Sequence, residues 1–190
     1  MLRVNLRQKY NHLSHEELLN MVHGLAANYV KYSGSCSQSL VSAIHRLIEI
    51  DDVVVRVATS SSGGQLRQVM GTCGALIGGT MVLDYFFGRP AMMMAYKKDT
   101  PSNVEQHIDA IQAATPLFYK FIREYGTILC PQIQMKLFGR HYYFIDEDEM
   151  EKFEIAGGHE DKCPNVVGKA ARWTMEILLF KDAISQEYSK

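Results

Sequence analysis

The sequence has 190 residues, of which 47% are hydrophobic and 22% are charged, and its formal net charge is −1. This composition is typical of one globular domain with a hydrophobic core. A nearly neutral chain has no electrostatic basis for binding nucleic acid or an anionic membrane surface. No apolar run reaches the roughly 18 residues that a membrane helix needs. The N-terminal residues also lack the apolar block of a signal peptide, so we predict a cytoplasmic protein.

Two helices are predicted in the first fifty residues, where hydrophobic side chains recur at helical spacing. Ser14 and Glu17 have the spacing of a capping box, which marks the start of the first helix. The segment 33–35 ends it, and the second helix is expected over about 35–50. Residues 51–59 are rich in valine, which favours a strand, but no second clear strand is available to pair with them. We therefore expect a short helix or an extended connector there.

The middle of the chain predicts a loop followed by two long helices. Residues 60–64 read SSSGG, a flexible loop by composition. The apolar pattern over 65–87 predicts one helix that carries Cys73 at its centre. A helix is also predicted over about 101–125, with proline at its first position. Pro116 is expected to kink or split this helix, because proline removes a backbone donor.

Shorter elements are predicted in the last third of the chain. Glycine and proline delimit helices over 131–138, about 146–156 and about 163–180. The segment 141–145, HYYFI, is predicted to be a short strand-like piece. The sequence as a whole predicts an all-α fold, a single domain over residues 1–190 that forms a helical bundle of about six or seven helices.

Four cysteines carry the most distinctive chemistry of the chain: Cys36, Cys73, Cys130 and Cys163. No CxxC pair is present, so the sequence has neither a thioredoxin-type redox motif nor a zinc knuckle. Cys130 and Cys163 each precede proline, which predicts that both are helix N-caps, and Cys36 lies in the first turn of its helix. A helix N-terminus stabilises negative charge, so we expect the pKa of these thiols to be lowered.

Cys73 is the exception, because the pattern places it in the middle of a helix. Each glycine in a helix interior costs about 0.5–1 kcal/mol relative to alanine, yet small residues surround this thiol: Gly71, Gly74, Ala75, Gly78 and Gly79. We expect another helix, or a compact inorganic group held in part by Cys73, to approach this backbone closely. Free cysteines also commonly fill core space, so inert core thiols are an alternative interpretation. Cysteine is not a preferred N-cap residue, and the repeated Cys-Pro helix starts therefore favour shared chemistry.

The order of the four cysteines and the segment CGALIG at 73–78 resemble the redox-active protein family named for its C_GCAxxG_C_C pattern. The segment CPNVVGKAARWTMEIL at 163–178 is similar to the C-terminal helix of that family, and the resemblance covers about residues 15–180. A related domain occurs in split-Soret cytochromes, where these cysteines are proposed to hold an iron–sulfur cluster. The resemblance implies a [2Fe–2S] or [4Fe–4S] cluster, with Gly74 and Gly78 at the binding site and with four ligands: Cys36, Cys73, Cys130 and Cys163.

We rank cluster binding first, a thiol–disulfide redox protein second, a structural zinc site third, and keep open a helical interaction module without a cofactor. Zinc sites usually draw their ligands in close pairs from tight turns, which this chain lacks. A cluster ligated only by cysteines leaves no open position for a substrate, so the sequence favours an electron carrier over a catalyst, and no catalytic residue is predicted. Its partner would be a redox protein whose identity the sequence does not give.

Two further features of the sequence each have two alternative interpretations. His159 lies four residues before Cys163 and is expected to be either a solvated loop residue or an alternative ligand. The run Met92–Met94 is expected to be either core filler or a flexible contact surface, because methionine adapts to irregular partners. The methionine run and the glycine-rich face are both compatible with a homodimer.

Overall fold

The computed structural model describes residues 2–187, with side chains described for residues 2–180. This part of the chain is all-α, as predicted, and has no strand beyond two isolated β-bridges. None of its helices is both long enough and apolar enough to cross a membrane. Its eight α-helices are α1 (His15–Ser33), α2 (Cys36–Leu47), α3 (Asp52–Val57), α4 (Gly74–Phe87), α5 (Pro101–Tyr125), α6 (Cys130–Phe138), α7 (Glu147–Ile155) and α8 (Cys163–Glu187).

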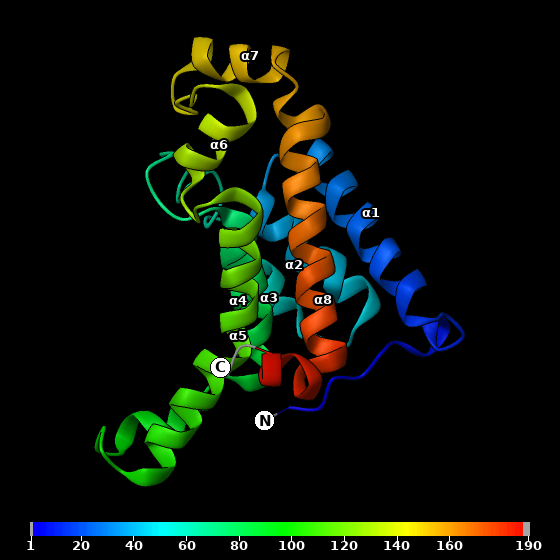
Figure 1. The fold of residues 1–190 in the computed structure, drawn as a ribbon, viewed down its shortest axis with the longest axis vertical. Coiled ribbons are helices and arrows are strands. Elements are labelled where there is room, and N and C mark those ends of the chain that lie inside the picture. Colours follow the sequence, from blue (N-terminus) through cyan, green and yellow to red (C-terminus); the bar gives the residue numbers. More distant parts are fainter. Residues whose placement is uncertain (1, 188–190) are drawn as a thin grey trace.

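One hydrophobic core holds the bundle together, and α8 is its central helix. It contacts α1, α2, α4 and α5, and Figure 1 shows α1 running beside it. Fully burying one large aliphatic or aromatic side chain contributes about 1.5–3 kcal/mol. The core draws such side chains from five helices, among them Val22, Val30, Leu40, Ile44, Val82, Leu83, Leu117, Phe121, Val167, Met175 and Ile177.

Local signals placed several helix ends correctly. The Ser14 hydroxyl accepts the backbone N–H of Glu17, whose carboxylate in turn accepts the N–H of Ser14 at 2.8 Å, which is the predicted capping box. Residues 51–59 contain α3 and are not a strand, since the Asp51 carboxylate accepts the N–H of Val53 and begins a helical turn. Pro116 lies inside a continuous α5 and does not split it.

The predicted strand-like piece at 141–145 is wrong. In the described part of the chain this segment is an irregular connection between α6 and α7. Tyr142 and Phe144 are buried, and they pack with Val69 and Phe153 in a second, smaller hydrophobic cluster. The alternating apolar side chains that suggested a strand therefore serve to anchor a loop.

The predicted helix over 65–87 is also wrong in its first half, because helical geometry begins only at Gly74. Five consecutive residues, from Gly63 to Arg67, have positive φ angles between 51° and 73°. Left-handed backbone costs roughly 1–2 kcal/mol per residue that is not glycine. Local backbone hydrogen bonds hold this left-handed turn, among them Leu66 N–H to Ser60 O at 3.0 Å and Val69 N–H to Gly63 O at 2.9 Å.

The glycine-rich face of α4 packs against other helices of the same chain. A Cβ added to Gly78 would lie 2.6 Å from the backbone oxygen of Ser37 in α2. A Cβ added to Gly79 would lie 2.6 Å from both Leu117 in α5 and Thr174 in α8. The close approach expected at this face is therefore made by α2, α5 and α8.

Replacing Gly78 by alanine should destabilise the fold. The obstructing atom is backbone, so α2 and α4 must move apart, and we expect a loss of about 1–3 kcal/mol in the free energy of unfolding. Gly24→Ala is a matched control, since Gly24 lies inside α1 with no heavy atom within 4 Å of an added Cβ. That control should gain about 0.5–1 kcal/mol. Urea unfolding followed by circular dichroism measures both, and equal effects of the two substitutions would contradict the packing argument.

Candidate cysteine site

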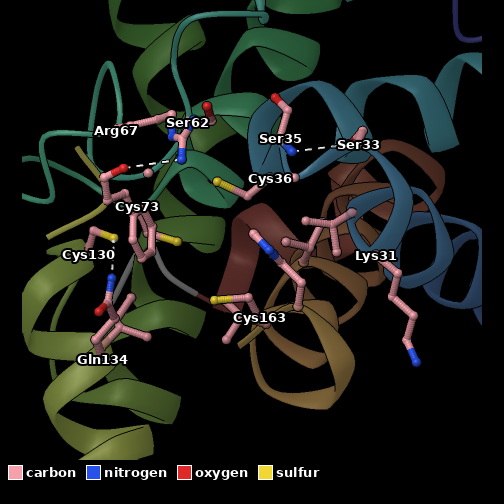
Figure 2. Close-up of a pocket in the computed structure, with 18 of the residues that line it drawn as sticks. Lys31, Ser33, Ser35, Cys36, Ser62, Arg67, Cys73, Cys130, Gln134 and Cys163 are labelled. Carbon is pink, nitrogen blue, oxygen red and sulfur yellow. Dashed lines mark hydrogen bonds between the residues drawn. The ribbon is translucent and has the colours of Figure 1, made fainter. Parts of the chain in front are cut away.

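The four cysteines line one cavity of about 420 Å³, although they lie far apart in the sequence. Figure 2 shows their sulfur atoms turned towards a common space. All four are free thiols: Cys36, Cys73, Cys130 and Cys163.

Each thiol lies at the start of a helix. Cys36, Cys130 and Cys163 are the first residues of α2, α6 and α8, and Cys73 is the N-cap of α4. The expectation that Cys73 lies in the middle of a helix is wrong, because residues 63–67 form the left-handed turn and α4 begins only at Gly74. The predicted N-cap role of Cys130 and Cys163 is also wrong. Leu129 is the N-cap of α6, and Cys163 has helical backbone and directly follows a π-helical turn, Gly158–Lys162.

Backbone hydrogen bonds fix two of these starts against each other. Cys73 N–H donates to Ile128 O at 2.8 Å, and Cys130 N–H donates to Gly71 O at 2.9 Å. These two bonds pair the segment before α4 with the segment before α6. The positions of Cys73 and Cys130 are therefore set by one short antiparallel contact.

Two glycines allow the chain to pass close to the sulfur atoms. A Cβ on Gly74 would overlap the Sγ atom of Cys36 and would lie 2.6 Å from Ser61 O. A Cβ on Gly64 would lie 2.9 Å from the Cβ of Cys130. Neither Gly74 nor Gly78 lines the cavity itself, but Gly74 lies against the sulfur of Cys36, whereas Gly78 packs against Ser37.

Burial raises the pKa of every one of the four thiols, contrary to the expectation that helix N-termini lower it. Desolvation is the largest cause at each, and neighbouring thiols add to it at three of them: Cys73, Cys130 and Cys163. At Cys36, the backbone N–H groups of Gly63, Ser37 and Gly74 act in the opposite direction without cancelling the rise. Backbone N–H groups near Cys36 and Cys73 thus reduce the cost of a buried thiolate, but they do not offset it in the absence of a cation.

Gln134 holds one of the sulfur atoms in place. Its side-chain amide donates to Cys130 Sγ at 3.5 Å, and its carbonyl oxygen accepts the N–H of Tyr142 at 2.9 Å. Gln134 is buried, and it opposes the rise that burial causes in the pKa of Cys130, which still reaches about 12. The spacing of four residues on one helix was a signal that sequence reasoning missed.

Other lining side chains had no sequence signal. Ser35 Oγ is buried and has no hydrogen-bond partner among the described residues. Lys31 and Arg67 bring positive charge to the lining, and Arg67 also donates to the Phe144 carbonyl at 3.1 Å. These residues come from loops and helix ends that only the fold brings together.

His159 lines the cavity and is largely buried, with a side chain that is 16% exposed. Its Nδ1 lies 2.6 Å from the Glu154 carboxylate, and its ring packs edge-on against Phe153. The expectation of a solvated loop histidine is therefore wrong. His159 forms part of the wall between the cavity and the second hydrophobic cluster.

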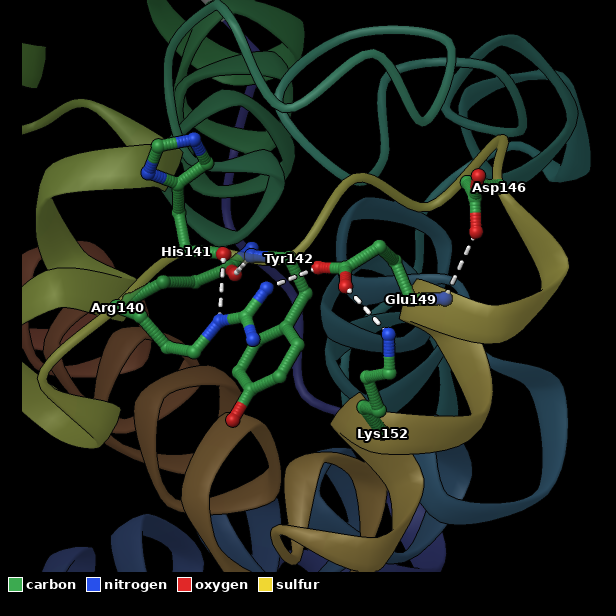
Figure 3. Close-up of polar contacts among 7 residues, drawn as sticks. Arg140, His141, Tyr142, Asp146, Glu149 and Lys152 are labelled. Carbon is green, nitrogen blue, oxygen red and sulfur yellow. Dashed lines mark hydrogen bonds and ion pairs between the residues drawn. The ribbon is translucent and has the colours of Figure 1, made fainter.

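The segment from α6 to α7 closes this side of the site through polar contacts at its surface (Figure 3). Arg140 pairs with Glu149 and lies over the Tyr142 ring, 4.5 Å from its centroid. Lys152 pairs with the same carboxylate at 3.1 Å, and Asp146 caps α7. Exposed ion pairs of this kind contribute little each, so the buried aromatic cluster supplies most of the stability of this wall.

Among the described residues, no three His, Cys, Asp or Glu side chains form a group that could hold one metal ion. A tetrahedral zinc ion binds sulfur at about 2.3 Å, which brings its sulfur ligands within roughly 4 Å of one another. The four sulfur atoms thus share a cavity without being gathered as tightly as a single ion requires.

The metal-free protein should therefore react slowly with alkylating reagents. A thiol with a pKa of about 12, such as Cys130, is ionised to an extent on the order of 10⁻⁴ at pH 8. We expect iodoacetamide to modify Cys130 at least about 100-fold more slowly than free cysteine. Because ionisation increases towards the pKa, the rate should rise about tenfold per pH unit between pH 8 and pH 11.

Mass spectrometry of peptides measures this rate, and the same protein unfolded in guanidinium chloride is the control. A Cys130 that reacts as fast in the folded protein as in the unfolded one would show that the thiol is not desolvated.

Residues 34–177 match the protein family described as "Putative redox-active protein (C_GCAxxG_C_C)". The match covers most of the chain and includes all four cysteines. Among curated proteins and among solved structures, no relative matches this chain. The resemblance stated from the residues is thus confirmed, and the chain belongs to the C_GCAxxG_C_C family of redox-active proteins.

Proposed function

We propose that this protein is an electron carrier that holds an iron–sulfur cluster on four cysteines. The observation that carries the proposal is that all four thiols of the chain line one cavity, each from the start of a different helix: Cys36, Cys73, Cys130 and Cys163. Their ligation would join the ends of α2, α4, α6 and α8 around one group.

The residues present fit such a group. Four thiols provide the donor set of a [2Fe–2S] or [4Fe–4S] cluster. Gly74 leaves room beside the sulfur of Cys36, and the buried Ser35 hydroxyl, which has no partner among the described residues, could donate a hydrogen bond to the bound group. Backbone N–H groups around Cys36 would stabilise its thiolate, and such hydrogen bonds to sulfur are one means of tuning a cluster potential.

Ionisation of the thiols also supports a polycationic occupant. Protonated thiols are favoured here chiefly because burial disfavours each thiolate, and because neighbouring thiolates would repel one another. Bound iron reverses this balance, since a coordinating thiol is deprotonated outright. A role in packing alone gives no reason to place four cysteines around one cavity when buried cysteine can be accommodated singly.

The lack of a compact ligand group among the described residues argues against a structural zinc ion. A single ion needs its ligands at one point, and the described side chains do not meet that condition. A cluster is larger, and in a four-iron cluster each thiolate binds a different iron, so its ligands stand farther apart. A dithiol–disulfide centre would use two of the thiols and leave the other two without a role.

A bound cluster would supply one-electron redox chemistry. The chain would bind it through sulfur, orient it through the fixed helix starts and exclude water with the apolar side chains of Ile133, Val166 and Val167. Ligation by cysteine alone leaves no position for a substrate, which favours electron transfer to a partner protein over catalysis.

Removing one ligand should remove the cluster. We expect anaerobically purified protein to contain about two or about four iron atoms per chain with an equal amount of acid-labile sulfide. Visible absorption should bleach on reduction. Cys73→Ser should lose most of the iron and sulfide, because a hydroxyl is a poor substitute for a thiolate ligand. Iron, sulfide and zinc analyses of both proteins measure this.

Ser62→Ala is a matched control, since it removes one heavy atom from the same lining without touching a thiol. It should retain iron and sulfide at the wild-type level. Zinc without sulfide would favour the structural zinc site, and colourless protein with two fast-reacting thiols would favour dithiol redox chemistry. Either result contradicts the cluster.

The glycine beside Cys36 should matter to cluster retention even though it supplies no ligand. An added Cβ at Gly74 would displace the Cys36 sulfur or the Ser61 backbone. We expect Gly74→Ala to lose at least half of its iron during gel filtration under air, with circular dichroism close to that of the wild type. Gly24→Ala, which meets nothing, should retain iron as the wild type does. Full retention in Gly74→Ala would show that this close approach does not position Cys36.

A further inference from the structure

A hairpin-like arm projects from the bundle, away from the cysteine cavity. It consists of η2 (Ala91–Ala95) and the N-terminal half of α5, and Figure 1 shows it extending from the lower end of the molecule. In the first twelve residues of α5, all of them described, Asn103 is the one that is buried. The core contacts of α5 begin only at Ala113.

Polar contacts give the arm a defined shape. Arg89 donates to the Asn103 carbonyl oxygen at 2.7 Å, and the Asn103 amide donates to the backbone oxygens of Tyr96 and Lys97 at 3.4 and 3.3 Å. Asn103 thus ties the segment after η2 to the first turn of α5. The arm therefore presents its side chains from a fixed backbone.

The arm exposes large apolar side chains in a regular pattern. Val104, Ile108, Ile111 and Phe118 follow one another at intervals of four, three and seven residues, which is the seam of a heptad repeat. Met92, Met94 and Tyr96 extend this surface onto η2 and the residue that follows it. Exposure of these seven side chains ranges from 39% to 65%.

A groove lies beside this seam. It has a volume of about 680 Å³ and runs between α4 and α5, with Leu76 and Thr80 on one wall and Ile111 and Phe118 on the other. Met94 of η2 also contributes to its lining. The molecule thus carries an apolar ridge next to a recess whose lining also includes Asp84, Arg89 and His107.

The exposed area has the size of half a dimer interface. At about 200 Å² for a fully exposed large side chain, seven half-exposed ones present on the order of 700 Å². A stable complex of standard size buries about 800 Å² on each partner. A small ligand in the groove would leave most of this surface in water, whereas another protein surface of the same extent would cover it.

We propose that this surface pairs with a second copy of the chain, the α5 helices lying antiparallel across a two-fold axis near Ile111. Two-fold symmetry places the ridge of each copy against the recess of the other, because both features lie on one face. Lys120 does not contribute to this surface, because it forms an ion pair with Glu176 of α8 at 2.8 Å. Apolar contact along the seam would therefore supply most of the binding.

Sedimentation of the anaerobically purified full chain tests the pairing. The wild type should have twice the mass of one chain at micromolar concentration. Ile108→Glu with Ile111→Glu should lose the dimer, since each protomer would bury two unpaired carboxylates. Val57→Glu is a matched control, because Val57 is equally exposed on α3, away from the arm. It should remain a dimer.

A cross-linking experiment tests the position of the proposed two-fold axis. It does not require the variant with two glutamates to fold. In Ile111→Cys, the new thiols of the two copies should be joined by a short bis-maleimide, and a cysteine at Val57 should not be. Circular dichroism and iron content near those of the wild type show that each variant is folded. A monomeric wild type, a dimer that survives both glutamates, or a dimer without a cross-link at residue 111 overturns the proposal. None of these outcomes bears on the cluster, which is measured separately by iron and sulfide.

Discussion

The close approach of α2 to α4 is the constraint on which the site depends. It is possible only because α4 begins CGALIGG, which leaves bare backbone at Gly74 and Gly78. At Gly74 the space is filled by the sulfur of Cys36, and one turn later at Gly78 it is filled by the backbone of Ser37. The glycine face of α4 therefore contacts the thiol of Cys36 and also allows α4 to pack closely against α2.

Burial and ionisation oppose each other at the cavity. Four thiols held together in a desolvated space remain protonated, and their pKa values rise as a consequence of the same packing that assembles them. The protein offers partial compensation in the backbone N–H groups near Cys36 and the amide of Gln134. These hydrogen bonds do not fully offset the unfavourable burial of the thiolates. The cavity therefore favours an occupant that brings several positive charges.

The left-handed turn from Gly63 to Arg67 allows Cys73 to lie at the start of α4. A regular helix through 65–73, which the apolar spacing of Leu66, Val69 and Met70 suggested, would carry Cys73 away from a helix end. In the fold, Leu66 and Met70 are 58% and 79% exposed, and Val69 packs in the second cluster. Backbone strain of this kind persists where surrounding structure over-determines it, and it concentrates at functional sites.

Patterns of local origin were read correctly from the sequence: the all-α class, the capping box at Ser14, the helix starts at Cys130 and Cys163, and the family that the four cysteines mark. Each depends on hydrogen bonds or spacing within a few residues, which a single sequence contains. The convergence of the thiols, the raised pKa values, the burial of His159 and the projecting arm were decided by tertiary structure alone. Desolvation and close packing depend on what other segments bring to the same place, and no local pattern encodes those distances.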